Sequence, residues 1–238
     1  MTTIQGKTVL ITGANRGIGR ALVDEALKWG ATRVYAGSRQ PFEHSDERVT
    51  RLALDVTDRE QIARAVERVG SSLDILVNNA GVCVLDDLTD EQALRDHLAV
   101  NLFGTFGVTT AFLPLLERSG GAVVNNVSLA ALASVPVMPA YSVSKAAAFS
   151  LSVGLRALLA ARGVSVSVAL TGPTDTDMVR DLPIPKATAQ SVAAAILAGV
   201  ENGEEEIFPD VVSEPLAEGW RGGVSKVLER QNAALLQA

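Results

Sequence analysis

The segment Thr12-Gly13-Ala14-Asn15-Arg16-Gly17-Ile18-Gly19 decides the expected fold, because it joins a short apolar run at 8–12 to a stretch with helically spaced apolar residues at 18–29. This order is typical of a strand, a glycine-rich loop and a helix. Glycine allows turn angles and a close ligand approach that a Cβ would block. The N–H groups and dipole of the helix N-terminus can hold a pyrophosphate there. The GxxxGxG spacing differs from the usual GxGxxG fingerprint, so a tight turn without a ligand stays open as the alternative.

The same alternation of strand and helix continues along the chain. The expected strands are Thr8–Thr12, Arg33–Ala36, Val49–Asp55, Leu73–Asn78, Ala122–Ser128, Val164–Leu170 and Glu206–Phe208. The expected helices are Ile18–Trp29, Asp58–Val69, Asp90–Leu116, Ala140–Arg162, Thr188–Glu201 and a last one from about Pro215. Most of these strands are continuously apolar, which calls for a parallel sheet covered by helices on both faces. We therefore expect an α/β fold, a single-domain doubly wound sheet of the Rossmann type over residues 1–238, with a substrate loop at about 172–187.

The composition is that of a soluble globular protein, with 47% hydrophobic and 20% charged residues among 238. Cys83 is the only cysteine and cannot form an internal disulfide, which favours a reducing, cytoplasmic setting. With His44 and His97 as the only histidines, no zinc-type ligand set can be assembled, and we expect no metal site. The net charge of -6, with scattered basic residues, argues against nucleic acid as a partner.

Membrane attachment is not expected either. The N-terminus lacks a cationic segment followed by a long apolar run, so it does not resemble a signal peptide. No window contains the roughly 18 uninterrupted apolar residues of a membrane span.

The end of the second expected strand, Ala36-Gly37-Ser38-Arg39, bears on the choice of cofactor. An NAD-specific site would place an acid here to bind the ribose 2′-hydroxyl, and none is present. Arg39 offers a permanently charged planar group suited to a 2′-phosphate, and Arg16 could approach the same phosphate from the other side. The pattern favours NADP(H); the alternative is that both arginines are solvated surface charges.

A second group of residues carries the chemistry. Ser128 stands at a strand end, while Tyr141 and Lys145 are four positions apart and so share one face of a helix. A cation beside a phenol favours the phenolate, which would make Tyr141 a general acid/base. Ser128 could hydrogen-bond the substrate oxygen where charge develops. Taken singly, each of these residues has an ordinary structural alternative, as a cap, a satisfied polar side chain or an amphipathic helix pair.

Taken together and in order, TGxxxGxG, Asn78-Asn79-Ala80-Gly81, Asn101, Ser128 and the YxxxK pair Tyr141/Lys145 resemble the short-chain dehydrogenase/reductase family. The resemblance implies an oxidoreductase in which Asn101, Ser128, Tyr141 and Lys145 are catalytic. It also implies that Lys145 binds the nicotinamide ribose and that Asn101 positions a water in a proton relay. The implied cofactor-binding residues are Gly13, Asn15, Arg16, Gly17, Ile18, Gly19, Ser38, Arg39, Asp55, Val56, Asn79, Ala80, Gly81, Tyr141, Lys145, Gly172, Thr174 and Thr176. One departure is Thr171, which stands where the family usually has a proline.

The expected substrate is an uncharged ketone or aldehyde that is reduced to an alcohol. The residues able to surround the reacting carbon are nearly all apolar: Leu129, Ala130, Val135, Val137, Met138, Pro173, Met178 and Leu182. Two alternatives remain, a 3-oxoacyl carrier-protein reductase and a non-catalytic NADP-binding regulatory protein. Because the helices at 90–116 and 140–162 are apolar around much of their circumference, we expect a homodimer or homotetramer.

Overall fold

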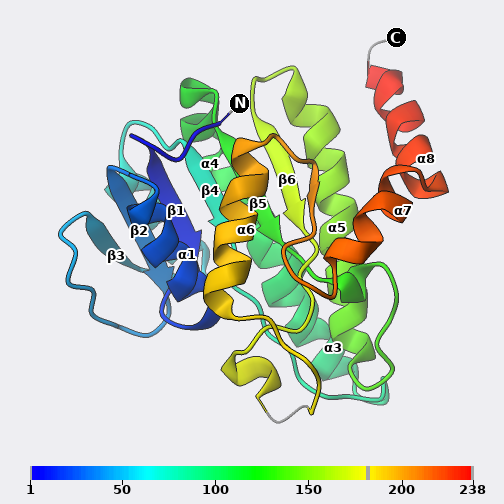
Figure 1. The fold of residues 1–238 in the computed structure, drawn as a ribbon. Coiled ribbons are helices and arrows are strands. Elements are labelled where there is room, and N and C mark those ends of the chain that lie inside the picture. The colour runs from blue at the N-terminus through cyan, green and yellow to red at the C-terminus, as the bar shows by residue number, and fades with distance from the viewer. Residues whose placement is uncertain (1, 181–182, 237–238) are drawn as a thin grey trace.

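A computed structural model describes residues 2–180 and 183–236 and shows a seven-stranded parallel sheet with the order β3-β2-β1-β4-β5-β6-β7 (Figure 1). The strands are β1 (Thr8–Thr12), β2 (Arg33–Ser38), β3 (Val49–Ala53), β4 (Ile75–Asn78), β5 (Ala122–Asn126), β6 (Ser165–Ala169) and β7 (Glu206–Ile207). Strands β1 to β3 extend to one side, and the chain then returns to place β4 on the other side of β1. The reversal leaves a crevice beyond the carboxyl ends of β1 and β4, where open α/β sheets bind ligands.

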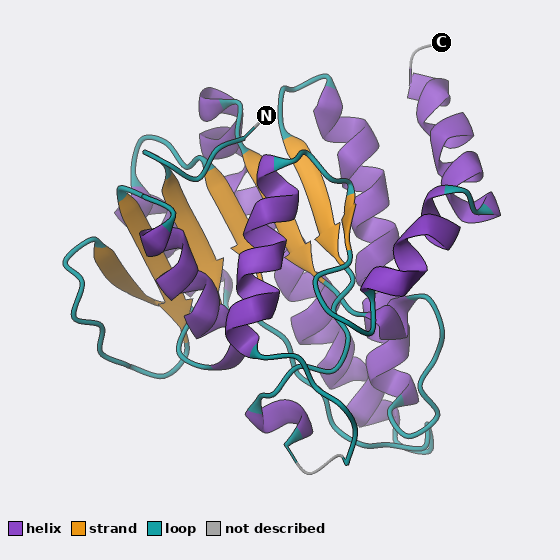
Figure 2. Cartoon of the chain, in the orientation of Figure 1, coloured by secondary structure: helices purple, strands orange, loops and turns teal. Residues whose placement is uncertain are grey.

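Helices cover both faces of the sheet, so the expected doubly wound fold is confirmed (Figure 2). The α-helices are α1 (Gly17–Lys28), α2 (Arg59–Val69), α3 (Glu91–Leu98), α4 (Thr105–Ser119), α5 (Pro139–Ala160), α6 (Ala189–Glu201), α7 (Ala217–Arg221) and α8 (Val224–Ala233). The shorter helical turns are η1 (Ala99–Gly104), η2 (Leu129–Ala131), η3 (Asp177–Val179), η4 (Glu214–Leu216) and η5 (Ala234–Leu236).

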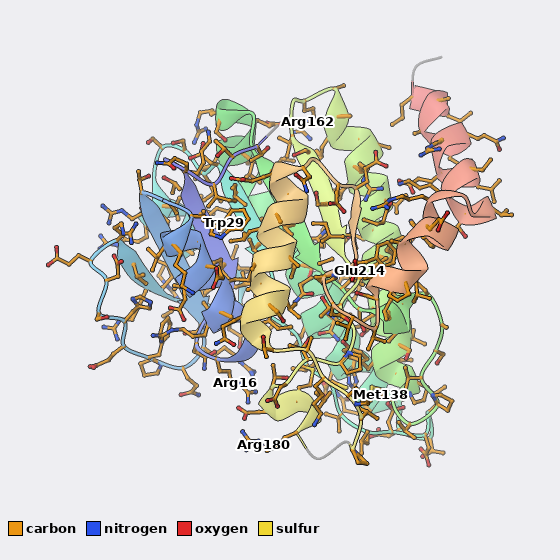
Figure 3. All side chains as sticks on the ribbon, in the orientation of Figure 1. Arg16, Trp29, Met138, Arg162, Arg180 and Glu214 are labelled. Carbon is orange, nitrogen blue, oxygen red and sulfur yellow. The ribbon has the colours of Figure 1, made fainter. Side chains whose placement is uncertain are left out.

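Alternation along β1 builds a core on each face of the sheet. Val9 and Ile11 pack with the apolar sides of α1 and α6, whereas Leu10 packs with those of α2, α4 and α5. This follows from the period of two in a strand, which sends successive side chains to opposite faces. Figure 3 shows Arg16, Met138 and Arg180 at the end of the molecule towards which the strands run, with Arg162 at the opposite end.

Two expected helices are interrupted. The stretch expected as one helix at 90–116 contains the π-helical turn η1 between α3 and α4. The last expected helix begins at about the expected place, with η4, but is divided into α7 and α8 by Gly222 and Gly223. The cap expected at Thr57 or Asp58 is Asp58, whose carboxylate accepts the N–H groups of Glu60 and Gln61.

Two helical stretches of the described chain, Glu91–Ser119 and Pro139–Ala160, are long and apolar enough to cross a membrane by length and composition. The apolar windows of the sequence did not predict this result. Side chains of α4 and α5 belong to the core on one face of the sheet, and core helices meet the same criterion. We therefore assign both stretches to the packing of the fold.

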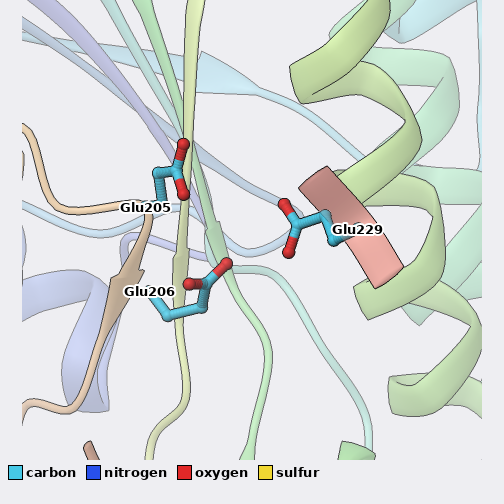
Figure 4. Close-up of side chains that lie close together, drawn as sticks. All are labelled: Glu205, Glu206 and Glu229. Atoms are coloured by element: carbon cyan, nitrogen blue, oxygen red, sulfur yellow. The ribbon is translucent and has the colours of Figure 1, made fainter. Parts of the chain in front are cut away.

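An ion cluster attaches α8 to the body of the protein. Glu205, Glu206 and Glu229 lie close enough together to suggest a metal site (Figure 4). However, the ammonium of Lys226 lies among them, at 2.7 Å from Glu205 and 2.9 Å from each of the other two. Arg156 on α5 also pairs with Glu206 and Glu229. Because each of these carboxylates already pairs with Lys226 or Arg156, we assign the cluster a structural role.

Candidate active site

A cavity of about 650 Å³ lies at the carboxyl ends of the central strands. This volume is within the range of small-molecule sites. All of the residues expected to bind the cofactor line this one cavity, as do Ser128, Tyr141 and Lys145. Asn101 is not among the lining residues. The fold thus brings together side chains from segments far apart in the sequence.

The glycine-rich turn forms one wall of the cavity and suits a bound pyrophosphate. Gly13 and Gly17 have φ angles of 65° and 55°, in the left-handed region that favours glycine. A Cβ at Gly19 would lie only 2.1 Å from the Gly13 carbonyl oxygen and 2.5 Å from Asn79 Nδ2. Helix α1 begins at Gly17 without a side-chain cap, which leaves first-turn N–H groups available to an anion. These features fit the diphosphate of a dinucleotide.

The end of the cavity near β2 carries the expected arginines. Arg39 is exposed, and Arg16 forms an ion pair with Asp177, with 2.8 Å between Nη1 and Oδ2. Ser38 is buried and its hydroxyl donates to the Gln40 carbonyl at 2.6 Å, so this hydroxyl is already engaged. No acidic side chain stands at the end of β2.

Asp55 and Val56 line the same end of the cavity. One carboxylate oxygen of Asp55 accepts both the backbone N–H and the hydroxyl of Thr57, at 2.9 and 2.7 Å. This turn fixes the loop that follows β3, and Val56 is buried within it. Asp55 therefore contributes to the shape of this wall through its own loop contacts.

The reactive side chains come from α5 and from the end of β5. Tyr141 and Lys145 stand on the first turns of α5, and Lys145 Nζ lies 5.6 Å from the centre of the Tyr141 ring. Ser128 forms a hydrogen bond with Tyr141 and also caps the short helix η2 by accepting the Ala130 N–H at 3.1 Å. The Lys145 ammonium donates to the Asn126 carbonyl at 3.1 Å.

Burial controls the protonation of this pair. Desolvation raises the pKa of Tyr141 well above its usual value, and the hydrogen bond with Ser128 opposes this rise only in part. Burial lowers the pKa of Lys145 from 10.5 to about 8. The expectation that the ammonium makes the phenol more acidic is thus wrong for this protein without a cofactor, because removal from water dominates for both groups. Tyr141 stays a neutral phenol, ready to donate a proton.

Asn101 lies behind the cavity, in the π-helical turn η1. Its side chain accepts the Val82 N–H at 2.9 Å and donates to the Val82 carbonyl at 3.0 Å and to the Ser144 hydroxyl at 2.8 Å. π-Helical turns inside longer helices often mark functional sites. Asn101 therefore connects the loop after β4 to α5 through these contacts.

Comparison with known proteins identifies the family to which this site belongs. The family model "short chain dehydrogenase" matches residues 7–186. The chain belongs to this family. Estradiol 17-beta-dehydrogenase 2 of Mus musculus is 36% identical over 191 residues, which are 74% of this chain, so the match spans about half (50%) of the length of the mouse protein. Ketoacyl reductase HetN of Nostoc sp. is 29% identical over 92% of this chain and 83% of its own.

A solved structure agrees with the family assignment along nearly the whole chain. A short chain dehydrogenase from Burkholderia cenocepacia J2315, in complex with NADP, superposes with a TM-score of 0.87 at 36% identity. The superposition covers 96% of this chain and 98% of that one.

Thr171, where the family resemblance led us to expect a proline, makes a defined contact in the structure. Its hydroxyl donates to Asn126 Oδ1 at 2.6 Å, and the Asn126 amide donates to Asn79 Oδ1 at 3.0 Å. The Asn79 amide in turn donates to the Thr12 carbonyl at 3.0 Å. This polar chain connects the ends of β6, β5, β4 and β1 along the floor of the cavity. The unexpected threonine at position 171 was the only feature of the sequence that indicated this polar chain. No sequence pattern predicted the part that Asn126 takes in it.

The part of the cavity beside Tyr141 is apolar, as expected. Leu129, Ala130, Val135, Val137, Met138, Pro173 and Met178 all line it, while Leu182 falls outside the described residues. Cys83 also lines the cavity and lies 3.6 Å from the Met138 sulfur, and burial raises the pKa of its thiol to about 11. His97, which no sequence pattern had marked as part of the site, is buried and packs edge-on against the Tyr141 ring, with 6.2 Å between the ring centres.

Proposed function

We propose that this short chain dehydrogenase is an NADPH-dependent reductase that converts an uncharged ketone or aldehyde to an alcohol in a reversible reaction. One observation carries the proposal: Tyr141, Ser128 and Lys145 share a cavity with the glycine-rich turn and with Arg16 and Arg39. The absence of an acid at the end of β2 supports NADPH over NADH. The NADP complex of the Burkholderia relative supports the same cofactor.

The residues of this chain would then act on the substrate oxygen. Ser128 hydrogen-bonds the carbonyl oxygen and holds it beside the Tyr141 hydroxyl. The dinucleotide, when bound, supplies the hydride to the carbonyl carbon. As negative charge develops on the oxygen, Tyr141 donates its proton there, and burial keeps that proton in place until it is needed. Lys145 lies next to the phenol and would hold the ribose of the cofactor, as the family resemblance implies.

The apolar lining beside Tyr141 supports an uncharged substrate. A second candidate, a 3-oxoacyl carrier-protein reductase, is favoured by the likeness to ketoacyl reductase HetN. A non-catalytic NADP-binding regulatory protein is the third possibility, and the convergence of the reactive side chains in one cavity argues against it.

We also propose a cytoplasmic homo-oligomer, a dimer or a tetramer. Large apolar side chains are exposed along η1, α4 and α5, including Phe103 at 63%, Phe106 at 47% and Leu158 at 57%. Burial of such side chains against a second copy of the chain would remove them from water. Size-exclusion chromatography with light scattering tests this assignment.

The test of the activity is the Tyr141→Phe variant, assayed by NADPH absorbance against ketones, aldehydes, ketoesters and acyl thioesters. We expect NADPH binding to be retained and turnover to fall by at least ~10²-fold. Tyr35→Phe is the matched control, because Tyr35, the other tyrosine, packs in the core outside the cavity. Near-normal turnover in Tyr141→Phe would refute the mechanism. Higher activity on acyl thioesters than on simple ketones would select the carrier-protein reductase, and NADPH binding without oxidation of any substrate would select the regulatory protein.

A further inference from the structure

An acidic side chain reaches across the mouth of the cavity to one of the arginines proposed for NADPH. Asp177 begins the short helix η3 in the loop after β6, and its Oδ2 lies 2.8 Å from Arg16 Nη1. Its other carboxylate oxygen pairs with Arg180. The glycine-rich turn also lies against this loop, since a Cβ at Gly17 would lie 3.1 Å from the Thr176 side chain. Figure 3 shows Arg16 and Arg180 at this same end of the molecule.

We propose that Asp177 is a specificity-determining residue whose carboxylate competes with the 2′-phosphate of NADPH for Arg16. The proposal rests on the proposed function, because it takes Arg16 as a ligand of that phosphate. Arg16 and Asp177 both line the cavity that contains Ser38 and Arg39, so the competing groups share one space.

Arg16 can exchange Asp177 for the 2′-phosphate without leaving either member of the ion pair unpaired. The Arg16 side chain is 66% exposed and therefore free to turn from a carboxylate towards a phosphate. A phosphate offers Arg16 more acceptor oxygens and more negative charge than a carboxylate does. Asp177 retains Arg180 as a partner after Arg16 leaves, so its charge does not become unpaired.

Competition of this kind lowers the preference for NADPH over NADH. NADH has no phosphate at the 2′ position and does not need Arg16, so its binding leaves the Arg16–Asp177 pair intact. NADPH must first separate the pair. By thermodynamic linkage, bound NADPH in turn weakens the contact between the glycine-rich turn and the segment around Asp177.

The experiment measures the dissociation constants of NADPH and NADH by fluorescence titration at low salt. Asp177→Asn is compared with Asp175→Asn, which removes the same charge two residues away. The Asp175 side chain is exposed, makes no ion pair with any described residue and does not line the cavity. Both substitutions are repeated in an Arg16→Gln background.

We expect Asp177→Asn to tighten NADPH binding by roughly 1.4- to 5-fold, the range for an exposed ion pair, and to change NADH binding less. Asp175→Asn should leave the NADPH/NADH ratio unchanged, and Arg16→Gln should abolish the effect of Asp177→Asn. The proposal is overturned if Asp177→Asn has no effect, tightens both cofactors equally, or acts equally in the Arg16→Gln background.

The two proposals fail differently. If Arg16→Gln weakens NADPH binding but Asp177→Asn does not strengthen it, only the role of Asp177 is refuted. If Arg16→Gln and Arg39→Ala both leave NADPH binding unchanged, the assignment of the 2′-phosphate to these arginines fails, and the role of Asp177 fails with it.

Discussion

Asn101→Ala is expected to destabilise the protein by about 3 kcal/mol. The substitution removes three hydrogen bonds, two to the backbone of Val82 and one to the Ser144 hydroxyl. The N–H and carbonyl of Val82 lose their Asn101 partner, at a cost of about 1 kcal/mol or more each, and the lost bond to Ser144 adds up to about 1 kcal/mol. For a domain of this size the melting temperature should fall by roughly 6 to 12 °C.

The assay is urea unfolding at neutral pH, followed by NADPH titration and turnover measurements. Because Ser144 stands between Tyr141 and Lys145 on α5, we expect turnover to suffer more than NADPH binding. Asn232→Ala is the matched control, since Asn232 is exposed on α8, and its stability should change by less than about 0.5 kcal/mol. A loss below 1 kcal/mol in Asn101→Ala would refute the reasoning that this side chain connects the two segments.

Further predictions concern protonation, the polar chain and the ion cluster. The free energy of unfolding of the wild type should rise between pH 8 and pH 10, and this rise should exceed that of Lys145→Met by about 2 to 3 kcal/mol. Urea denaturation of both proteins across this pH range measures the difference. Folded Lys145 releases its proton near pH 8 and the unfolded side chain near 10.5, so the unfolded state binds more protons in this window. Thr171→Val should lower the free energy of unfolding by about 1 to 2 kcal/mol, because Asn126 Oδ1 loses its hydrogen-bond donor. Thr171→Ser keeps the hydroxyl and should keep the stability of the wild type. Equal stability of the two variants would contradict this role of the hydroxyl. Lys226→Met should cost about 3 to 5 kcal/mol and speed amide exchange in α8, because Glu206 and Glu229 then share Arg156 alone and the Glu205 carboxylate loses the Lys226 ammonium; unchanged exchange would argue against the proposed attachment.

The sequence predicted most of the fold because the decisive signals are local. The run at residues 8–12, the glycines that follow and the helical spacing after Gly17 define a strand, a turn and a helix by nearest-neighbour geometry alone. Continuous apolar strands then indicated a parallel sheet. The i, i+4 spacing of Tyr141 and Lys145 was enough to place both side chains on one face of α5.

The sequence could not predict features that depend on contacts between distant segments. The π-helical turn around Asn101 forms where that side chain bonds the loop after β4, whereas the apolar periodicity there is continuous. The pairing of Arg16 with Asp177 joins two loops whose separation only the fold determines. The pKa of Tyr141 depends on how deeply the phenol is buried. The charge of Lys145, one helical turn away, predicts a lowered pKa, whereas burial raises it.

The polar chain from Thr12 through Asn79 and Asn126 to Thr171 also determines when the cavity can form during synthesis of the protein. A ribosome releases the first strand early, but Asn126 has no donor for its Oδ1 until residue 171 has emerged and β6 has docked beside β5. A nascent or truncated chain that stops before this point lacks the finished floor beneath Lys145. Ability to hold the dinucleotide should therefore arise late in translation, and abruptly, when the sixth strand is added to the sheet.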